Sequence, residues 1–226
     1  PAPQAFGYRT SQAKHRANIL ARDCSFRIWG FVFERHEQVV YNIWDLASLG
    51  RNTFMANLPT KTVIGLINVS RPVHWVKNLG IFAAIVFSGT LFEEAYFIKT
   101  VLGFLIFNLA ASATYTFNDL QDIERDRQHP IKKNRPLAKG DIPPFLALAY
   151  AAILASAAMV FAYFLSYLFF ILIGIYLTMQ LGYSLYLKNI PVIDILIIAS
   201  GFIIRVYSGA FLVDAHLSVW FLLCVV

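Results

Sequence analysis

Residues 142–187 read IPPFLALAYAAILASAAMVFAYFLSYLFFILIGIYLTMQLGYSLYL, and these 46 positions contain no charged side chain. A helix needs about 20 consecutive apolar residues to cross the hydrocarbon layer of a bilayer. The stretch is too long for one crossing and has the length of two, with a tight turn near Ser166. It therefore predicts two transmembrane helices joined by a short turn.

Apolar runs on both sides of this stretch predict further spans. We expect a first span at residues 73–92, a second at 96–117 and a fifth at 195–213. A sixth begins near Leu217 and is still apolar at Val226, so we expect the bundle to continue past that residue. Of all residues, 58% are hydrophobic and 14% are charged, which is far from the composition of soluble domains. The predicted fold is an all-α, polytopic transmembrane helix bundle.

Composition also divides the chain into two regions. Residues 1–60 are mixed in polarity and show no sustained apolar period, and we assign them no role. Residues 61–226 hold the expected transmembrane domain, with about six spans of membrane-crossing length. Two cysteines, Cys24 and Cys224, predict neither a disulfide framework nor a metal site.

The charged residues of the connections predict the orientation, because Lys and Arg are retained on the cytoplasmic side of a membrane. Residues 118–141 carry six of them, and the chain up to Lys77 carries ten. The connections after spans one, three and five hold Glu93, Glu94 and Asp214 but no Lys or Arg. We therefore expect a multi-pass integral membrane protein with its 118–141 loop on the cytoplasmic face. The net charge of +6 then reflects orientation and contact with anionic membrane lipids, and we expect no nucleic-acid partner.

The loop itself, NDLQDIERDRQHPIKKNRPLAKGD (118–141), is rich in aspartate. On one continuous helix, Asp119, Asp122 and Asp126 would lie within a sector of about 60°. The stripe would be about 10 Å long, which suits a diphosphate bridged by Mg²⁺. Mg²⁺ prefers a few carboxylates together with phosphate oxygens and water. We therefore predict that the three aspartates are metal ligands and catalytic residues.

A plain helix cap is the alternative interpretation of this loop. In that case the acids would pair with Arg125, Arg127 and Lys132 on a solvated surface. The loop follows a membrane span directly, however, and four basic residues trail the aspartates. These are Lys132, Lys133, Arg135 and Lys139. Such cations suit the neutralisation of phosphates, which favours binding of a metal-bound diphosphate.

The residues Asn118, Asp119, Asp122 and Asp126 follow the pattern NDxxDxxxD. This pattern resembles the first aspartate-rich motif of the UbiA superfamily of intramembrane prenyltransferases. The continuation DRQHPIKKNRPLAKG and the segment RPVHWVKNLGIFAA (71–84) look closest to the decaprenyl-phosphate phosphoribosyltransferase branch. The resemblance covers about residues 64–226.

The resemblance implies a bundle of helices around a central cavity, with a second polar motif on later helices. It also implies Mg²⁺-dependent transfer of phosphoribose from phosphoribosyl pyrophosphate to a polyprenyl phosphate, with release of diphosphate. The expected partners are these two substrates and membrane lipids, and self-association is left open.

Further residues are candidates for contact with phosphate groups. Tyr183 and Lys188 resemble a Tyr and Lys pair of the family, at a spacing one residue longer than YxxxK, although interfacial anchoring would explain them equally well. Arg205 lies inside the fifth span, where an arginine is energetically expensive, and would hold either a phosphate or a structural salt bridge. The predicted substrate-binding set is Asn118, Arg71, Lys77, Lys132, Lys133, Arg135, Tyr183, Lys188 and Arg205.

Two other functions are compatible with the sequence. An ordinary prenyltransferase of the same superfamily would bind a prenyl diphosphate on the same loop and transfer the prenyl group to an aromatic acceptor. A transporter or channel-like protein would use the acidic loop to bind cations and would release no diphosphate.

Overall fold

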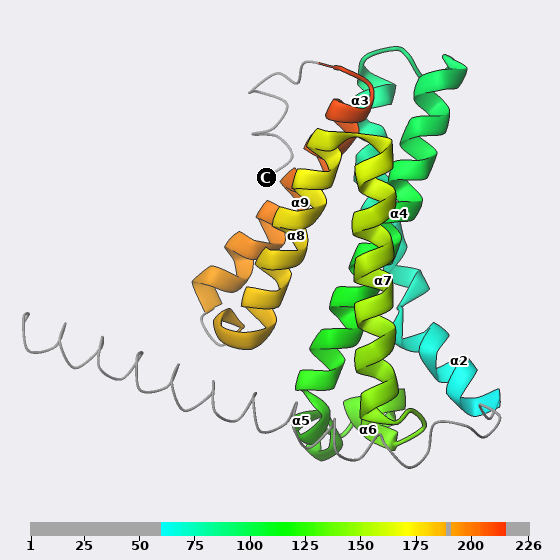
Figure 1. Ribbon diagram of the computed structural model, residues 1–226. Coiled ribbons are helices and arrows are strands. Elements are labelled where there is room, and N and C mark those ends of the chain that lie inside the picture. Colours follow the sequence, from blue (N-terminus) through cyan, green and yellow to red (C-terminus); the bar gives the residue numbers. More distant parts are fainter. Residues whose placement is uncertain (1–59, 189–190, 216–226) are drawn as a thin grey trace, which may run out of the picture. The chain divides into compact units, whose positions relative to one another are not determined.

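The computed structural model describes residues 60–188 and 191–215, which belong to one compact unit. The predicted N-terminal region, residues 1–60, lies outside the described residues except at its last position. Across the described ranges every regular element is a helix and none is a strand (Figure 1). The prediction of an all-α fold is confirmed.

Among the described residues, four long helices form the body of the unit (Figure 1). They are α4 (Glu94–Gln121), α7 (Pro144–Leu165), α8 (Tyr167–Gly182, continued by the π-helical turn η4, Tyr183–Leu187) and α9 (Pro191–Leu212). Each is long and apolar enough to cross a membrane. They correspond to the predicted second, third, fourth and fifth spans, which identifies an integral membrane protein. The sixth predicted span, which begins near Leu217, lies outside the described residues.

The predicted turn at Ser166 is present and consists of a single residue between α7 and α8. Ser166 has an extended backbone (φ −165°, ψ 137°). Its N–H donates to the carbonyl of Ala162 at 3.0 Å, and its own carbonyl accepts from the N–H of Phe170 at 2.9 Å. The chain therefore reverses direction with both backbone groups of Ser166 hydrogen-bonded.

The first predicted span differs from expectation. It is not one α-helix but a 3₁₀ helix, η2 (Pro72–Ile81), followed by a short α-helix, α3 (Phe82–Phe87), and preceded by α2 (Thr60–Val69). A 3₁₀ helix rises about 2.0 Å per residue, so η2 and α3 together cover about 29 Å, close to the hydrocarbon thickness. The segment reaches membrane length with fewer residues than an α-helix needs.

Side chains at positions i and i+3 align on a 3₁₀ helix, and this explains the local conformation. Trp75 and Asn78 lie on such a row and both reach α4. The Trp75 indole donates to Ser112 at 3.2 Å, and the Asn78 amide donates to the Asn108 oxygen at 2.6 Å. Ile81, next on the row, is fully buried. The stretch thus satisfies its polar groups along one edge against α4.

The core lies where α4, α7, α8, α9 and η2 meet, and it includes Phe107, Phe169 and Tyr176. Close backbone contact between α9 and η2 depends on Gly209. A Cβ atom at that position would lie 1.9 Å from the carbonyl oxygen of Ile81. Only glycine therefore allows these two elements to approach so closely.

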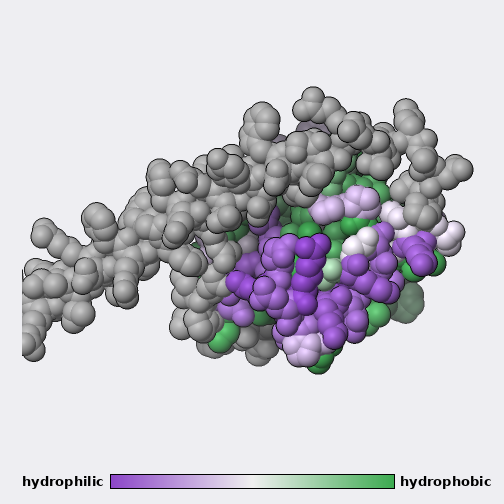
Figure 2. All heavy atoms as spheres, turned by 90° about the horizontal axis from the view of Figure 1, so that it is seen from below, coloured by the Kyte–Doolittle hydropathy of each residue, from purple (hydrophilic) through white to green (hydrophobic). Residues whose placement is uncertain are grey.

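Short helices connect α4 to α7 at one end of the unit. They are α5 (Ile123–Gln128), η3 (Lys132–Asn134) and α6 (Pro136–Lys139). Figure 2, a view from below, shows hydrophilic side chains gathered over this end. The aspartate-rich loop therefore lies on a polar face beyond the apolar helices.

Candidate functional site

The aspartates of the loop lie at the junction of α4 and α5, where the helix is interrupted. Asp122 separates the two helices with φ −98° and ψ 4°, so the continuous helix assumed for the acidic stripe does not form. Asp119 and Asp126 are nevertheless brought together by Arg135. One guanidinium nitrogen of Arg135 lies 3.1 Å from Asp119 Oδ1 and 2.7 Å from Asp126 Oδ2. Both carboxylates are buried, with 3% and 2% of their residue surface exposed.

Asp119 has a second cationic partner in Arg71, which precedes η2. The Arg71 guanidinium bonds to Asp119 and lies 5.4 Å from the ring centroid of Tyr115. Arg71 has φ 50° and ψ 61°, a left-handed conformation that is costly for a residue other than glycine and further disfavoured before Pro72. Strain of this kind is typical of functional sites, where surrounding contacts hold it in place.

The remaining aspartate, Asp122, is paired with a residue from the end of α8. Lys188 Nζ donates to Asp122 Oδ1 at 2.5 Å, and Ser184 Oγ donates to Asn118 Oδ1 at 3.1 Å. Asp122 follows Asn118 by four residues, and Lys188 follows Ser184 by four residues. The end of α4 and the end of α8 therefore run in the same direction and in register. Sequence reasoning missed Ser184, because its spacing from Lys188 has meaning only once the two elements are paired.

The unusual spacing of Tyr183 and Lys188 corresponds to the π-helical turn η4. The Lys188 N–H donates to the carbonyl of Tyr183, five residues earlier, at 3.2 Å. The Tyr183 hydroxyl donates to Asp194 Oδ1 on α9 at 2.7 Å. The turn thus accommodates the extra residue and ties the ends of α8 and α9 together. Single π turns are frequent at functional sites.

The cluster of Asp119, Asp122, Asp126, Arg71, Arg135 and Lys188, here called the ionic cluster, is formally neutral. Its cations come mainly from segments distant in sequence. The local pairs expected of a plain helix cap are weaker or lie elsewhere: Arg125 is 3.9 Å from Asp122, and Arg127 pairs with the exposed Glu124 at 2.7 Å. The ionic cluster is therefore a tertiary arrangement rather than a solvated helix end.

Magnesium fits the donor chemistry of this cluster, although the carboxylates are held by cations. Within residues 60–188 and 191–215, no three His, Cys, Asp or Glu side chains are grouped so as to hold a metal. Asp126 Oδ1, however, is buried without a hydrogen-bond partner. Carboxylate oxygens are the ligands that Mg²⁺ prefers. An unpartnered oxygen on Asp126, whose other oxygen shares Arg135 with Asp119, is a suitable starting point for such an ion.

Three more predicted phosphate-binding residues lie on the surface. Lys77 on η2 and Lys132 and Lys133 on η3 are exposed. None of them forms an ion pair within the described part of the chain. Lys132 and Lys133 share the polar end with Arg135 and have charges free to meet an anion.

Arg205 lies apart from the ionic cluster, deep in the bundle. Its Nε donates to Asn78 at 2.7 Å, one terminal nitrogen donates to the Gly201 carbonyl at 2.6 Å, and the other donates to Tyr176 at 3.3 Å. No carboxylate of the described residues pairs with it. Asn78 also contacts Asn108, eleven residues before Asp119, an offset of about 16 Å along α4 by helical rise. None of the hydrogen-bond partners of Arg205 belongs to the ionic cluster.

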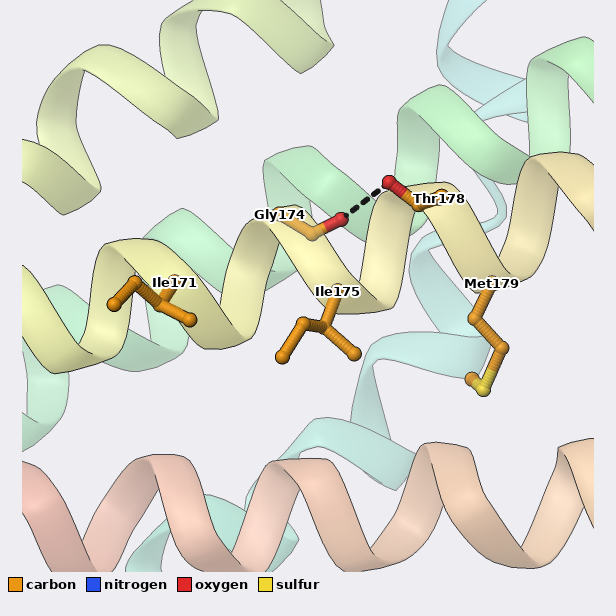
Figure 3. A pocket seen from close by; sticks show the side chains of 5 residues that line it. All are labelled: Ile171, Gly174, Ile175, Thr178 and Met179. Atoms are coloured by element: carbon orange, nitrogen blue, oxygen red, sulfur yellow. Dashed lines mark hydrogen bonds between the residues drawn. The ribbon is translucent and has the colours of Figure 1, made fainter.

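A shallow apolar groove of about 540 Å³ follows one side of α8 (Figure 3). Figure 3 shows Ile171, Ile175 and Met179 along it, one helical turn apart. The hydroxyl of Thr178, the polar side chain in the lining, is bonded to the Gly174 carbonyl at 2.9 Å. The groove offers no group that would act on a phosphate, so it does not compete with the ionic cluster as the reactive site.

Known proteins resemble this chain over most of its described length. A decaprenyl-phosphate phosphoribosyltransferase of Mycolicibacterium smegmatis is 41% identical over 172 residues, which is 74% of this chain and 54% of the relative. One of Corynebacterium glutamicum is 38% identical over 169 residues, covering 73% and 51%. The chain thus spans about half the length of the curated relatives it matches.

A solved structure and a family profile agree with these relatives. A UbiA homolog from Archaeoglobus fulgidus, solved with GPP and Mg²⁺, superposes with a TM-score of 0.60 at 22% identity, covering 71% of this chain and 58% of the other. At that identity the likeness concerns the fold. The profile described as UbiA prenyltransferase family matches residues 79–226, well over half of the chain. This chain belongs to the UbiA prenyltransferase family.

Proposed function

We propose that this chain forms part of a membrane transferase that moves phosphoribose from phosphoribosyl pyrophosphate to a polyprenyl phosphate, releasing diphosphate. The ionic cluster carries the proposal, because each of three neighbouring aspartates is paired with a cationic side chain at the polar end of membrane-spanning helices. The names of the relatives at 36–41% identity support the same donor group and acceptor lipid.

The residues of the cluster suit a diphosphate leaving group. Arg71, Arg135 and Lys188 would donate charge-assisted hydrogen bonds to phosphate oxygens, which are about twice as strong as neutral ones. Asp119, Asp122 and Asp126 would hold Mg²⁺, which supplies positive charge to the departing diphosphate. Low exposure of the cluster strengthens these interactions, because bulk water does not screen them.

Positioning of the donor would fall to neighbouring groups. Asn118 at the end of α4 bonds to Ser184, and Tyr183 precedes Ser184 at the end of α8. Both are close in sequence to residues of the ionic cluster. Lys132 and Lys133 would meet the outer phosphate oxygens from the surface, and Lys77 would serve from η2. The acceptor is an anionic phosphate and already nucleophilic, so the chain needs no general base for it.

The acceptor's hydrocarbon tail would remain among the apolar helices while its head group reaches the polar end. We place that end on the cytoplasmic side, because the Lys and Arg residues of the loops are concentrated there. Arg205, some distance below, would act on the lipid side of the bundle rather than on the diphosphate.

Transfer of label tests the proposal. The full-length protein in lipid vesicles is incubated with Mg²⁺, polyprenyl phosphate and phosphoribosyl pyrophosphate labelled in the ribose. We expect label to enter the lipid fraction with an equal amount of diphosphate released. In a parallel incubation with labelled prenyl diphosphate and an aromatic acceptor, label entering the acceptor would support a prenyltransferase. Cation flux across the vesicles without diphosphate release would support a transporter, and either result would contradict the proposal.

A further inference from the structure

The ion pairs of the ionic cluster bear on how metal and diphosphate bind there, and this inference rests on the proposed function. The cations of the cluster already occupy the aspartates that the metal would bind. Arg135 bonds to both Asp119 and Asp126, and Lys188 bonds to Asp122. The carboxylates expected to hold a metal are thus already neutralised by the groups expected to hold phosphate. Binding must therefore rearrange these pairs.

A metal ion alone gains little from such a cluster. To reach Asp119 and Asp126 it must displace Arg135, whose side chain is only 27% exposed. The displaced guanidinium then has no anion to pair with. The positive charges of the metal and of Arg135 also repel each other in a site with little water, where charges are poorly screened.

A diphosphate alone meets the opposite difficulty. To gain Arg135 and Lys188 it must draw them from Asp126 and Asp122, whose side chains are 2% and 15% exposed. Carboxylates without partners at such burial are strongly unfavourable, and they repel the incoming anion. The metal alone leaves a cationic side chain without an anion, and the diphosphate alone leaves a carboxylate without a cation.

We propose that Arg71, Arg135 and Lys188 are built-in counterions that couple the binding of divalent metal to that of diphosphate. When both ligands enter, each carboxylate exchanges a cationic side chain for the metal, and each side chain exchanges a carboxylate for a phosphate oxygen. Every charge keeps a partner throughout. Asp126 Oδ1, which is buried and has no hydrogen-bond partner, is an oxygen that the metal can take without breaking an existing pair. The same coupling makes metal and product diphosphate leave together.

Metal binding, rather than turnover, tests this coupling. The full-length protein in detergent is titrated with Mn²⁺, followed by its electron paramagnetic resonance signal, with and without inorganic diphosphate. Protein-free titrations correct for Mn²⁺ bound by diphosphate in solution. In the wild type, diphosphate should raise the affinity for Mn²⁺ about tenfold or more, within the range of coupled sites.

The informative variant is Arg135→Gln, because the proposal predicts that losing this cation increases the affinity for Mn²⁺ in the absence of diphosphate. Freeing Asp126, and leaving Asp119 paired with Arg71 alone, should raise the affinity for Mn²⁺ alone by about tenfold, and the further gain from diphosphate should shrink. Arg127→Gln is the matched control, because Arg127 pairs with the exposed Glu124 outside the ionic cluster. It should bind Mn²⁺ as the wild type does. Should Arg135→Gln fail to fold, Lys188→Gln should likewise raise the affinity for Mn²⁺ alone, because it frees Asp122.

The outcomes separate this inference from the proposed function. If the folded variant binds Mn²⁺ alone no better than the wild type does, the counterion exchange is wrong. Diphosphate-dependent Mn²⁺ binding by the wild type would then still leave the proposed function standing. If the wild type binds no Mn²⁺ even with diphosphate present, the proposed function fails and the coupling fails with it.

Discussion

Lys188 at the end of α8 donates a 2.5 Å hydrogen bond to Asp122 at the end of α4, and the two side chains are 7% and 15% exposed. The residues are 66 positions apart in the chain. Their contact joins two membrane-spanning helices at the polar end and contributes one ion pair to the ionic cluster. It is thus both a structural tie and part of the candidate site.

Replacing Lys188 by Gln tests this double role. Loss of the cation leaves Asp122 partly buried without its partner, which should cost about 1–3 kcal/mol of stability. Thermal denaturation in detergent measures this loss, and equilibrium binding should show a weaker affinity for diphosphate in the presence of Mg²⁺. Lys139→Gln is the control, because Lys139 is 63% exposed and 3.9 Å from Asp141. Equal effects of the two substitutions would contradict the assignment.

A pair of glycines tests the packing that brings the elements of the site together. Gly209→Ala would place a Cβ atom 1.9 Å from the carbonyl of Ile81, so it should separate α9 from η2 and lower the melting temperature. Gly174→Ala meets only the end of Met159 at 3.7 Å. Because alanine favours a helix by up to about 1 kcal/mol over glycine, this second change should be neutral or stabilising. Similar melting temperatures for both variants would show that the close contact is wrong.

Arg205 should influence the bundle and not the diphosphate. Arg205→Lys keeps the charge but cannot reach Asn78, Gly201 and Tyr176 together, so the protein should lose about 1–3 kcal/mol of stability. Affinity for diphosphate with Mg²⁺ should stay within about twofold of the wild type, because the hydrogen bonds of Arg205 go to Asn78, Gly201 and Tyr176 and not to the ionic cluster. A large loss of diphosphate affinity in a protein that melts normally would refute this separation. Tyr176→Phe, which removes one hydrogen bond, should give a smaller loss of stability.

The spans were predictable because an apolar run of membrane length leaves the backbone few alternatives to a helix. Residues 142–187 indicated two helices and a turn at Ser166, and the turn lies there. The 3₁₀ conformation of Pro72–Ile81 was not predictable, because it follows from a row of contacts with α4 rather than from local propensity. The break of the helix at Asp122 was missed for a similar reason.

The sequence singled out residues that the structure pairs with one another, but it did not predict those pairs. The spacing of Asp119, Asp122 and Asp126 singled them out, and Arg71, Arg135 and Lys188 were named as phosphate ligands by their charge. Their pairing with the aspartates depends on the packing of η2 and α8 against α4, which a single sequence does not reveal. The role of Ser184 depends on the same register.

Binding of radiolabelled diphosphate to the purified full-length protein, measured at increasing Mg²⁺, tests the central claim most directly. We expect one diphosphate per protein, bound only when Mg²⁺ is present. In Asp119→Asn this binding should be lost, while the protein keeps a cooperative melting transition. Diphosphate binding that ignores Mg²⁺, or that is unchanged in Asp119→Asn, would contradict the account.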